Sequence, residues 1–296
     1  MSSSKVALIT GGASGMGLAV AQTLAPKCWT VHLLDFNKAP RRGSRAVSPQ
    51  LPVFHQVDVT SWEPLSGAFA KAFSQAGRLD FVFVNAGVVE RDNFYDTPGS
   101  DDVPPEPNRK TLDVNLNSVV NQSYLALHFF RRSPHGGKNA TLVMTASAGG
   151  LYPSQFCPIN SASKAGVIHL MRSIAFPYHH TSGIRVYATC PGTVRTNLMN
   201  ADEWTTFPEA YFTPLSRVAS AVEMLVEGGE MTDAWGRTVH EGENYGLAVE
   251  INAGDVYFRD GREFCDEAMR VVIGATSMEN QLARLEEHKA KQNGGL

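Results

Sequence analysis

The stretch Thr10-Gly11-Gly12-Ala13-Ser14-Gly15-Met16-Gly17 decides the fold. It follows a short apolar run, 5–10, and opens a segment, 15–24, in which apolar residues recur at helical spacing. Glycines between a strand and a helix let the chain turn tightly. They also let a pyrophosphate approach the backbone at the helix N-terminus, whose free N–H groups favour anions. A plain strand-to-helix turn is the alternative, but this context favours a dinucleotide-binding turn.

Beyond the turn, short apolar runs alternate with segments of helical periodicity. The predicted strands are 5–10, 29–35, 53–57, 79–84, 140–145, 184–190 and 245–251, and the predicted helices are 15–24, 61–76, 109–132, 159–178, 213–227 and a broken one over 266–292. Such alternation is typical of a parallel sheet with helices on both faces. We predict a single α/β domain over residues 1–260, a Rossmann-type doubly wound parallel sheet of about seven strands, followed by a helical extension at 261–296.

Composition narrows the possible functions. The 296 residues are 43% hydrophobic and 19% charged, which excludes wholesale disorder. A net charge of −3 argues against a nucleic-acid binder. No apolar run approaches the roughly 18 residues of a membrane span, and the N-terminus lacks the pattern of a signal peptide, so we expect a cytoplasmic protein. The four cysteines (Cys28, Cys157, Cys190 and Cys265) form no Cys-x-x-Cys pair, and no metal site stands out.

The residue that ends the second predicted strand bears on the choice of cofactor. Asp35 stands where a carboxylate can accept hydrogen bonds from both hydroxyls of an adenosine ribose and repel a 2′-phosphate. This favours NAD over NADP. Arg41, Arg42 and Arg45 follow in a proline-containing loop, and they would favour NADP if they faced the cofactor rather than solvent.

A set of motifs in fixed order resembles the short-chain dehydrogenase/reductase family over about residues 5–255. The set comprises Gly11-x-x-x-Gly15-x-Gly17, Asp58-Val59, Asn85-Ala86-Gly87, Asn115, Ser147, Lys164 and Pro191-Gly192. Each motif alone is weak, but their joint order and spacing are specific. Three stretches, VHLLDFN, GLYPSQFCPINSASKAG and CPGTVRTNLM, look most like the NAD-dependent 15-hydroxyprostaglandin dehydrogenase branch of that family.

The resemblance implies a role for each matching position. In the family, Asp58 would bind the adenine amino group with Val59 beside the ring, Lys164 would grip the nicotinamide ribose, and Asn115 would hold a helix kink and a relay water. Ser147 would bind the substrate oxygen. The implied cofactor-binding residues are Gly11, Ser14, Gly15, Met16, Gly17, Asp35, Asp58, Val59, Asn85, Ala86, Gly87, Lys164, Pro191, Gly192, Val194 and Thr196.

One position departs from the family. Its catalytic tyrosine should stand four residues before Lys164, on the same helix face, and that residue is Asn160. An amide does not titrate usefully, and general acid–base catalysis contributes about 10²–10⁴-fold. The protein therefore catalyses an isomerisation or cyclisation, or binds without catalysis, or uses another proton donor such as Tyr152, or carries an engineered change at Asn160.

The substrate is expected to be a small, mostly apolar molecule with a hydroxyl or carbonyl group. Residues 88–108, 149–157 and 195–215 would shape its pocket, and they follow no general code. The main hypothesis is an NAD-dependent oxidoreductase. The alternative is a non-redox isomerase, cyclase or pseudoenzyme on the same scaffold. The resemblance also implies a homodimer or homotetramer formed through the helices at 109–132 and 159–178.

Overall fold

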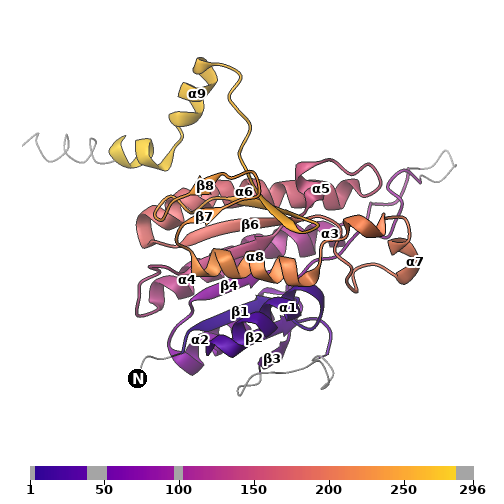
Figure 1. The fold of residues 1–296 in the computed structure, drawn as a ribbon, viewed down its shortest axis with the longest axis horizontal. Coiled ribbons are helices and arrows are strands. Elements are labelled where there is room, and N and C mark those ends of the chain that lie inside the picture. Colours follow the sequence, from indigo (N-terminus) through magenta and orange to yellow (C-terminus); the bar gives the residue numbers. More distant parts are fainter. Residues whose placement is uncertain (1–3, 39–51, 97–102, 285–296) are drawn as a thin grey trace, which may run out of the picture. The chain divides into compact units, whose positions relative to one another are not determined.

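Eight strands form one sheet in the order β10-β9-β6-β5-β4-β1-β2-β3 in a computed structural model that describes residues 4–38, 52–96 and 103–284 (Figure 1). The strands are β1 (Val6–Thr10), β2 (Thr30–Asp35), β3 (Val53–Gln56), β4 (Phe81–Val84), β5 (Thr141–Thr145), β6 (Arg185–Pro191), β9 (Ala248–Asn252) and β10 (Asp255–Arg259). All neighbours pair in parallel except β9 and β10. The predicted α/β fold is confirmed, with one more strand than expected.

The strand order reverses between β1 and β4, which pair with each other although two strands separate them in sequence. In an open sheet of this kind, ligands bind outside the carboxyl ends of the strands at such a reversal. The glycine turn directly follows β1, so it lies at this point of the sheet.

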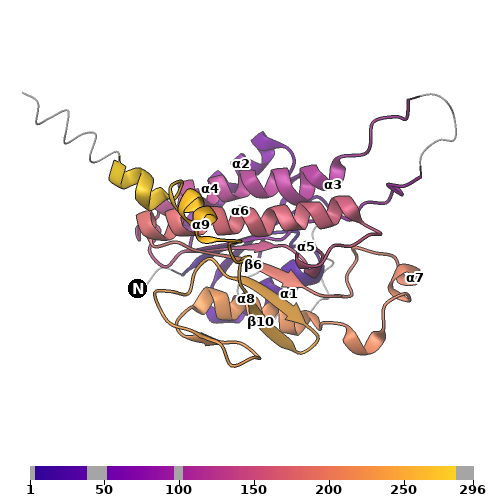
Figure 2. The same cartoon turned by 90° about the horizontal axis from the view of Figure 1, so that it is seen from above.

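Helices cover both faces of the sheet (Figure 2). The first face is covered by α2 (Trp62–Ala76), α4 (Ser118–Arg132) and α6 (Pro158–Ser182), and the second by α1 (Gly15–Leu24) and α8 (Leu215–Glu227). Each face has its own hydrophobic core, with Phe69 and Phe130 fully buried in the first and Val222 and Phe83 in the second. The near-continuous apolar strands are explained by this double cover.

The predicted helix at 109–132 is interrupted. It consists of α3 (Lys110–Leu112), a π-helical turn η2 (Asp113–Asn117) and α4. A π-turn accommodates one extra residue and is frequent at functional sites. By contrast, α6 runs without a break from Pro158 to Ser182, although Pro177 lies inside it.

The carboxyl end of the chain was predicted least well. The sequence DVYFR forms the antiparallel edge strand β10, which pairs with β9 through register partners such as Tyr257 and Glu250. A small hairpin of β7 (Met231–Thr232) and β8 (Thr238–Val239), and the short helices α5 (Ala148–Leu151) and α7 (Ala201–Trp204), were also not predicted. The expected helix from 266 is represented by α9 (Glu267–Gly274) and residues 278–284, and its remainder lies outside the described residues.

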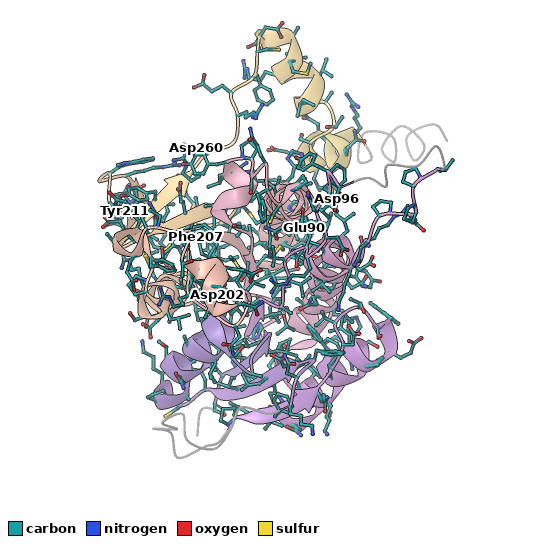
Figure 3. The ribbon with its side chains drawn as sticks, turned by 90° about the vertical axis from the view of Figure 1, so that its right-hand side faces the viewer. Glu90, Asp96, Asp202, Phe207, Tyr211 and Asp260 are labelled. Atoms are coloured by element: carbon teal, nitrogen blue, oxygen red, sulfur yellow. The ribbon has the colours of Figure 1, made fainter. Side chains whose placement is uncertain are left out.

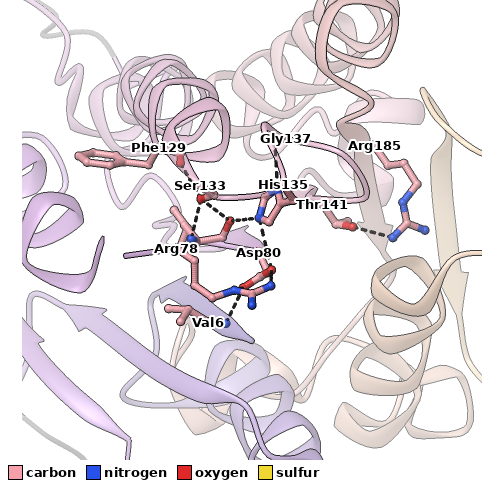
Figure 4. A network of polar contacts seen from close by, with 10 residues as sticks. Val6, Arg78, Asp80, Phe129, Ser133, His135, Gly137, Thr141 and Arg185 are labelled. Carbon is pink, nitrogen blue, oxygen red and sulfur yellow. Dashed lines mark hydrogen bonds and ion pairs between the residues drawn. The ribbon is translucent and has the colours of Figure 1, made fainter. Parts of the chain in front are cut away.

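A polar network closes the amino end of the sheet, opposite the glycine turn (Figure 4). Arg78 Nε and the Val6 N–H donate to one carboxylate oxygen of Asp80 at 2.9 and 2.8 Å, and His135 Nε2 lies 3.3 Å from the other. Burial alone would raise the pKa of Asp80, but the bonds from His135, Arg78 and Val6 outweigh it and lower that pKa to about 2.

The chain separates into two compact units, Met1–Arg259 and Asp260–Leu296. The first contains the sheet and its helices. In the second, Asp266 is the N-cap of α9, and its side chain accepts a hydrogen bond from the Met269 N–H. Among the helices of the described ranges, none combines the length and apolar character that a membrane crossing requires.

Candidate active site

The glycine turn has the geometry that a phosphate-binding turn requires. Gly11 and Gly15 have φ values of 65° and 54°, a region that side-chain-bearing residues rarely adopt. A Cβ on Gly17 would lie 2.3 Å from the Gly11 carbonyl oxygen, so no side chain fits there. The N-cap Ser14 is extended, and its hydroxyl does not bond the first turn of α1. The N–H groups of that turn are thus not capped by their own N-cap side chain.

Asp35 lies at the carboxyl end of β2, beside the glycine turn. Its Oδ2 accepts the Ala13 N–H at 2.9 Å, and its Oδ1 accepts the Asn37 N–H at 2.9 Å. Oδ1 also accepts the Asn37 Nδ2 at 3.2 Å, so both of its acceptor positions are used, whereas Oδ2 keeps one free position for a ribose hydroxyl. Arg41, Arg42 and Arg45, which compete with it in the sequence argument, lie outside the described residues.

The adenine end of the predicted site follows β3. Asp58 accepts hydrogen bonds from the Thr60 N–H and hydroxyl at 2.9 and 2.7 Å, which fixes its carboxylate. Val59 is buried beside it. These two residues therefore lie on a turn fixed by hydrogen bonds, as contact with an adenine ring requires.

The side chain of Asn85 links neighbouring strands through hydrogen bonds, which the sequence did not predict. Its Nδ2 donates to the Thr10 carbonyl at 3.1 Å, and its Oδ1 accepts the Thr145 hydroxyl at 3.2 Å. It thereby joins the carboxyl ends of β1, β4 and β5. Gly11 packs against it so closely that an added Cβ would lie 2.9 Å from that Nδ2. Its side chain thus braces the carboxyl ends of these strands, and Ala86 and Gly87 follow it directly in the chain.

An amide network joins the π-turn to α6. Asn115 Oδ1 accepts the Val88 N–H at 2.9 Å, which leaves its Nδ2 to donate to the Val88 carbonyl at 2.8 Å and to Asn160 Oδ1 at 3.0 Å. Because the Val88 N–H can only donate, the orientation of Asn115 is determined, and that of Asn160 follows from it. The Asn160 Nδ2 is left as the donating end of its amide.

Ser147 and Lys164 lie on adjoining elements. Ser147 is the N-cap of α5, and its Oγ accepts the Gly149 N–H at 3.0 Å. Lys164 lies one turn after Asn160 on α6, and its Nζ donates to the Thr145 carbonyl at 2.7 Å. An added Cβ on Gly87 would lie 3.6 Å from Lys164 Nζ and 3.3 Å from Asn115 Oδ1. Gly87, Asn115 and Lys164 therefore converge.

The hydroxyl of Tyr152, the predicted alternative proton donor, is bound to a carboxylate on β9. Its hydroxyl donates to Glu250 Oε2 on β9 at 3.2 Å, and the Arg259 guanidinium lies 5.8 Å above its ring. Burial and the Glu250 carboxylate raise the pKa of Tyr152. Ser147 is the N-cap of α5 and Tyr152 is its C-cap. The hydroxyl of Tyr152 therefore anchors the short helix that Ser147 begins.

The remaining predicted residues lie after β6. Pro191 ends that strand, and the Gly192 N–H donates to the Ile251 carbonyl at 2.8 Å. Val194 is buried, and the Thr196 side chain would lie 3.1 Å from a Cβ on Gly15. Met16 packs against the second core. Of the residues that follow β6, Thr196 therefore borders the glycine turn.

Glu90 is a site residue that sequence reasoning missed. Its carboxylate accepts the N–H groups of Ile159 and Asn160, at the N-terminus of α6. A carboxylate there complements the positive end of the helix dipole and fixes the first turn, which carries Asn160. Glu90 stands 69 residues before Ile159, so no local pattern could have indicated it. Figure 3 shows Glu90 on the face that also carries Asp202 and Phe207.

Comparison with known proteins decides the family. A family model described as short chain dehydrogenase matches residues 5–205. The chain belongs to the short-chain dehydrogenase/reductase family. This family of oxidoreductases was expected from the motifs, and that prediction is confirmed.

Two relatives give the range of similarity within the family. Short-chain dehydrogenase/reductase prx7 of Penicillium rubens is 49% identical over 280 residues, which cover 90% of this chain and 98% of its own. Human 15-hydroxyprostaglandin dehydrogenase (NAD+) is 34% identical over 205 residues, covering 67% and 71%. The likeness to the prostaglandin branch is therefore weaker than the likeness to prx7.

Solved structures agree on the fold. A short-chain type dehydrogenase/reductase from Mycobacterium marinum has a TM-score of 0.68 at 23% identity, covering 85% of this chain and 95% of that one. The 3-ketoacyl-(acyl-carrier-protein) reductase from Brucella melitensis, solved with NADH, has a TM-score of 0.66 at 22% identity, covering 84% and 97%.

Proposed function

We propose that this short-chain dehydrogenase/reductase uses NAD(H) and acts on a hydroxyl or carbonyl group of a small, mostly apolar molecule. The observation that carries the proposal is the Asp35 carboxylate, held against the glycine turn by the Ala13 N–H at 2.9 Å. A fixed carboxylate in that place accepts the hydroxyls of an adenosine ribose and repels a 2′-phosphate. The human relative of 34% identity is named as an NAD+ enzyme, which supports the same cofactor.

The residues of the cleft fit a dinucleotide. Added Cβ atoms at Gly11 and Gly17 would clash with the protein itself, so the turn carries no side chains at these positions, and the first N–H groups of α1 are not capped by Ser14. Asp58 and Val59 would hold the adenine. Lys164 would hold the nicotinamide ribose. When bound, the nicotinamide gives or accepts a hydride.

The reactive end of the cleft offers two hydrogen-bond donors to a substrate oxygen. The Ser147 hydroxyl accepts from the Gly149 N–H, so its own hydrogen is available to donate. The Asn160 Oδ1 is used by Asn115, so its Nδ2 is the end of the amide that can donate to a substrate. Donors fixed in this way stabilise negative charge that develops on a carbonyl oxygen. Ser147 and Asn160 would therefore orient and polarise the substrate.

Binding measurements test the cofactor assignment. NADH and NADPH are titrated separately, with nucleotide fluorescence as the readout. We expect NADH to bind more tightly. In Asp35→Asn the loss of charge-assisted hydrogen bonds, about 1.5–3 kcal/mol, should weaken NADH by roughly 10–150-fold. Asp255→Asn, at an exposed carboxylate on β10, is the matched control. Equal or tighter NADPH binding by the unaltered protein would contradict the assignment.

Asn160 supports a second candidate function. It stands one helical turn before Lys164, where the family pattern has its catalytic tyrosine, and an amide cannot serve as a general acid. A non-redox isomerase, cyclase or pseudoenzyme would need only the polarising donors. Asn160→Tyr separates the two candidates. If the scaffold is redox-competent, hydride transfer from NADH to an apolar aldehyde rises, by up to about 10²–10⁴-fold. If the site is non-redox, neither the unaltered protein nor the variant transfers hydride.

We further propose that the protein assembles as a homodimer or homotetramer through α4 and α6. Val120 and Tyr124 on α4 are 45% and 66% exposed, which leaves apolar side chains on an outer helix face. Sedimentation of the unaltered protein and of Tyr124→Glu measures the effect. The variant should sediment as a smaller species, and an unchanged oligomer would reject this interface.

A further inference from the structure

Lys164 is a buried ammonium with no acidic partner. The residue is 7% exposed, and its Nζ donates to the Thr145 carbonyl at 2.7 Å. In the described part of the chain no carboxylate forms an ion pair with it. A buried charge is normally paired, because desolvation costs more than one carbonyl bond returns. This residue is therefore arranged so that its proton is held weakly.

The groups around Lys164 carry no charge that would compensate. Burial lowers the pKa of Lys164 to about 8, and Cys190 on β6 is the one titratable group whose charge acts on it. Burial and Glu250 raise the pKa of Cys190 to about 12, so its thiol is neutral at working pH. From η2 the neutral amide of Asn115 lies beside the same Gly87 position as Nζ, and the α5 residue Gly150, which packs against the Lys164 backbone, carries no side chain.

The amine also lies beside Gly87. It converges with Asn115 on the space above Gly87, where an added Cβ would lie 3.6 Å from Nζ. On α6 it shares a face with Asn160, one turn earlier. A tyrosine at 160 would place an aromatic ring on that face. The Asn160 amide is shorter than a tyrosine side chain, so no phenol stands between the amine and a substrate oxygen polarised by Ser147 and Asn160.

We propose that Lys164 itself exchanges the proton with the substrate oxygen, an inference that rests on the redox function proposed above. In reduction, a bound nicotinamide would supply the hydride, with its electron pair, to the carbonyl carbon. The carbonyl π pair moves to oxygen, which takes a proton from the Lys164 ammonium. The products are an alcohol and a neutral amine, and solvent returns the proton to the amine. Oxidation of the alcohol runs through the same transfers in reverse.

The first test measures the amine in the cofactor-free protein. Trace acetylation with acetic anhydride between pH 6 and 10, read by peptide mass spectrometry, reports the neutral fraction of each lysine. The exposed Lys71 serves as the internal reference. We expect Lys164 labelling to rise with a midpoint near pH 8, below that of Lys71. Labelling of Lys164 at the same pH as Lys71 would overturn the proposal, because the amine would then be fully basic. No labelling at any pH would also overturn it, because the amine would then be inaccessible.

The second test separates charge from proton transfer. Lys164→Arg keeps a cation for the ribose, but a guanidinium does not release its proton in this pH range. We expect NADH binding within about threefold of the unaltered protein, and turnover of 4-nitrobenzaldehyde lower by about 10²–10⁴-fold. In the unaltered protein, reduction should decline above pH 8 as the ammonium is lost. Thermal unfolding midpoints verify that the variant is folded.

The outcomes distinguish this inference from the function on which it rests. Failure of the unaltered protein to bind NADH or to reduce the aldehyde would refute the redox function and the proton role together. Normal turnover in the unaltered protein with Lys164→Arg still within threefold would refute the proton role alone. So would a Lys164→Arg variant that keeps the decline above pH 8.

Discussion

A histidine pair under α2 should make stability depend on pH. His32 on β2 is fully buried, and its Nδ1 lies 3.1 Å from His55 Nε2 on β3. The rings stack with centroids 5.4 Å apart. The His32 Nε2 has no hydrogen-bond partner in the described structure. Burial, helped by the charges of His55 and Lys71, lowers the pKa of His32 to about 4.

The sign of the effect follows from proton binding. Between pH 6.5 and 4 the unfolded chain binds a proton at this position and the folded protein does not, so stability is present above pH 6.5 and is lost as the pH falls. With a pKa of 6.5 unfolded and about 4 folded, His32 costs about 2 kcal/mol of stability between pH 7 and pH 5. That loss exceeds a tenth of the total for a typical domain.

The perturbation is His32→Gln, which keeps a polar side chain beside His55 but cannot titrate. Urea unfolding followed by tryptophan fluorescence gives the free energy of unfolding at pH 7 and pH 5. The unaltered protein should lose about 2 kcal/mol more than the variant over this range. His180→Gln, at an exposed histidine, is the matched control and should keep the full loss. Equal losses in the unaltered protein and in His32→Gln would refute the reasoning.

Three further predictions concern other parts of the molecule. Gly15→Val should abolish NADH binding while thermal unfolding shows the fold retained, because the side chain would take the space of the pyrophosphate and strain a φ of 54°; normal binding would reject the phosphate turn. Asp80→Asn should lower the free energy of unfolding in urea by about 2–4 kcal/mol at pH 7. This difference should vanish as the pH falls from about 4 through 2, because the unaltered carboxylate becomes protonated over that range. Tyr152→Phe should leave the decline of turnover above pH 8 in place, with kcat reduced less than tenfold, because its hydroxyl anchors α5 through Glu250; complete loss of turnover would make Tyr152 the proton donor instead.

Regular elements were predicted well wherever burial and local periodicity coincide. The helix α1 was expected at 15–24 and spans Gly15–Leu24, because glycines precede it and Pro26 follows it closely. Strands covered on both faces are apolar throughout, so β1 and β5 were located to within a residue. Here the period and the flanking breakers are properties of the local chain, which a sequence displays directly.

Features that depend on distant contacts could not be predicted in this way. The sequence of β10 alternates weakly, and its pairing with β9 follows from a turn at Ala253 with φ of 49°, a conformation that a non-glycine residue rarely adopts. Glu90 reaches α6 across 69 residues, and Tyr152 reaches Glu250 across 98. The site motifs were recognised as residue types, whereas the direction of each amide and carboxylate depends on partners that only the folded chain brings together.

Because of the π-turn at Asp113–Asn117, the orientation of Asn115 depends on the number of residues in this segment. Each residue of an α-helix rotates the chain by about 100°, and a π-turn holds one residue more than an α-turn. Deleting Asn117 would restore a regular helix and rotate Asn115 relative to α4, away from Val88 and Asn160. Selection at this point therefore acts on insertion and deletion as well as on substitution. Among family sequences, a one-residue gap here would mark members whose amide network is built differently.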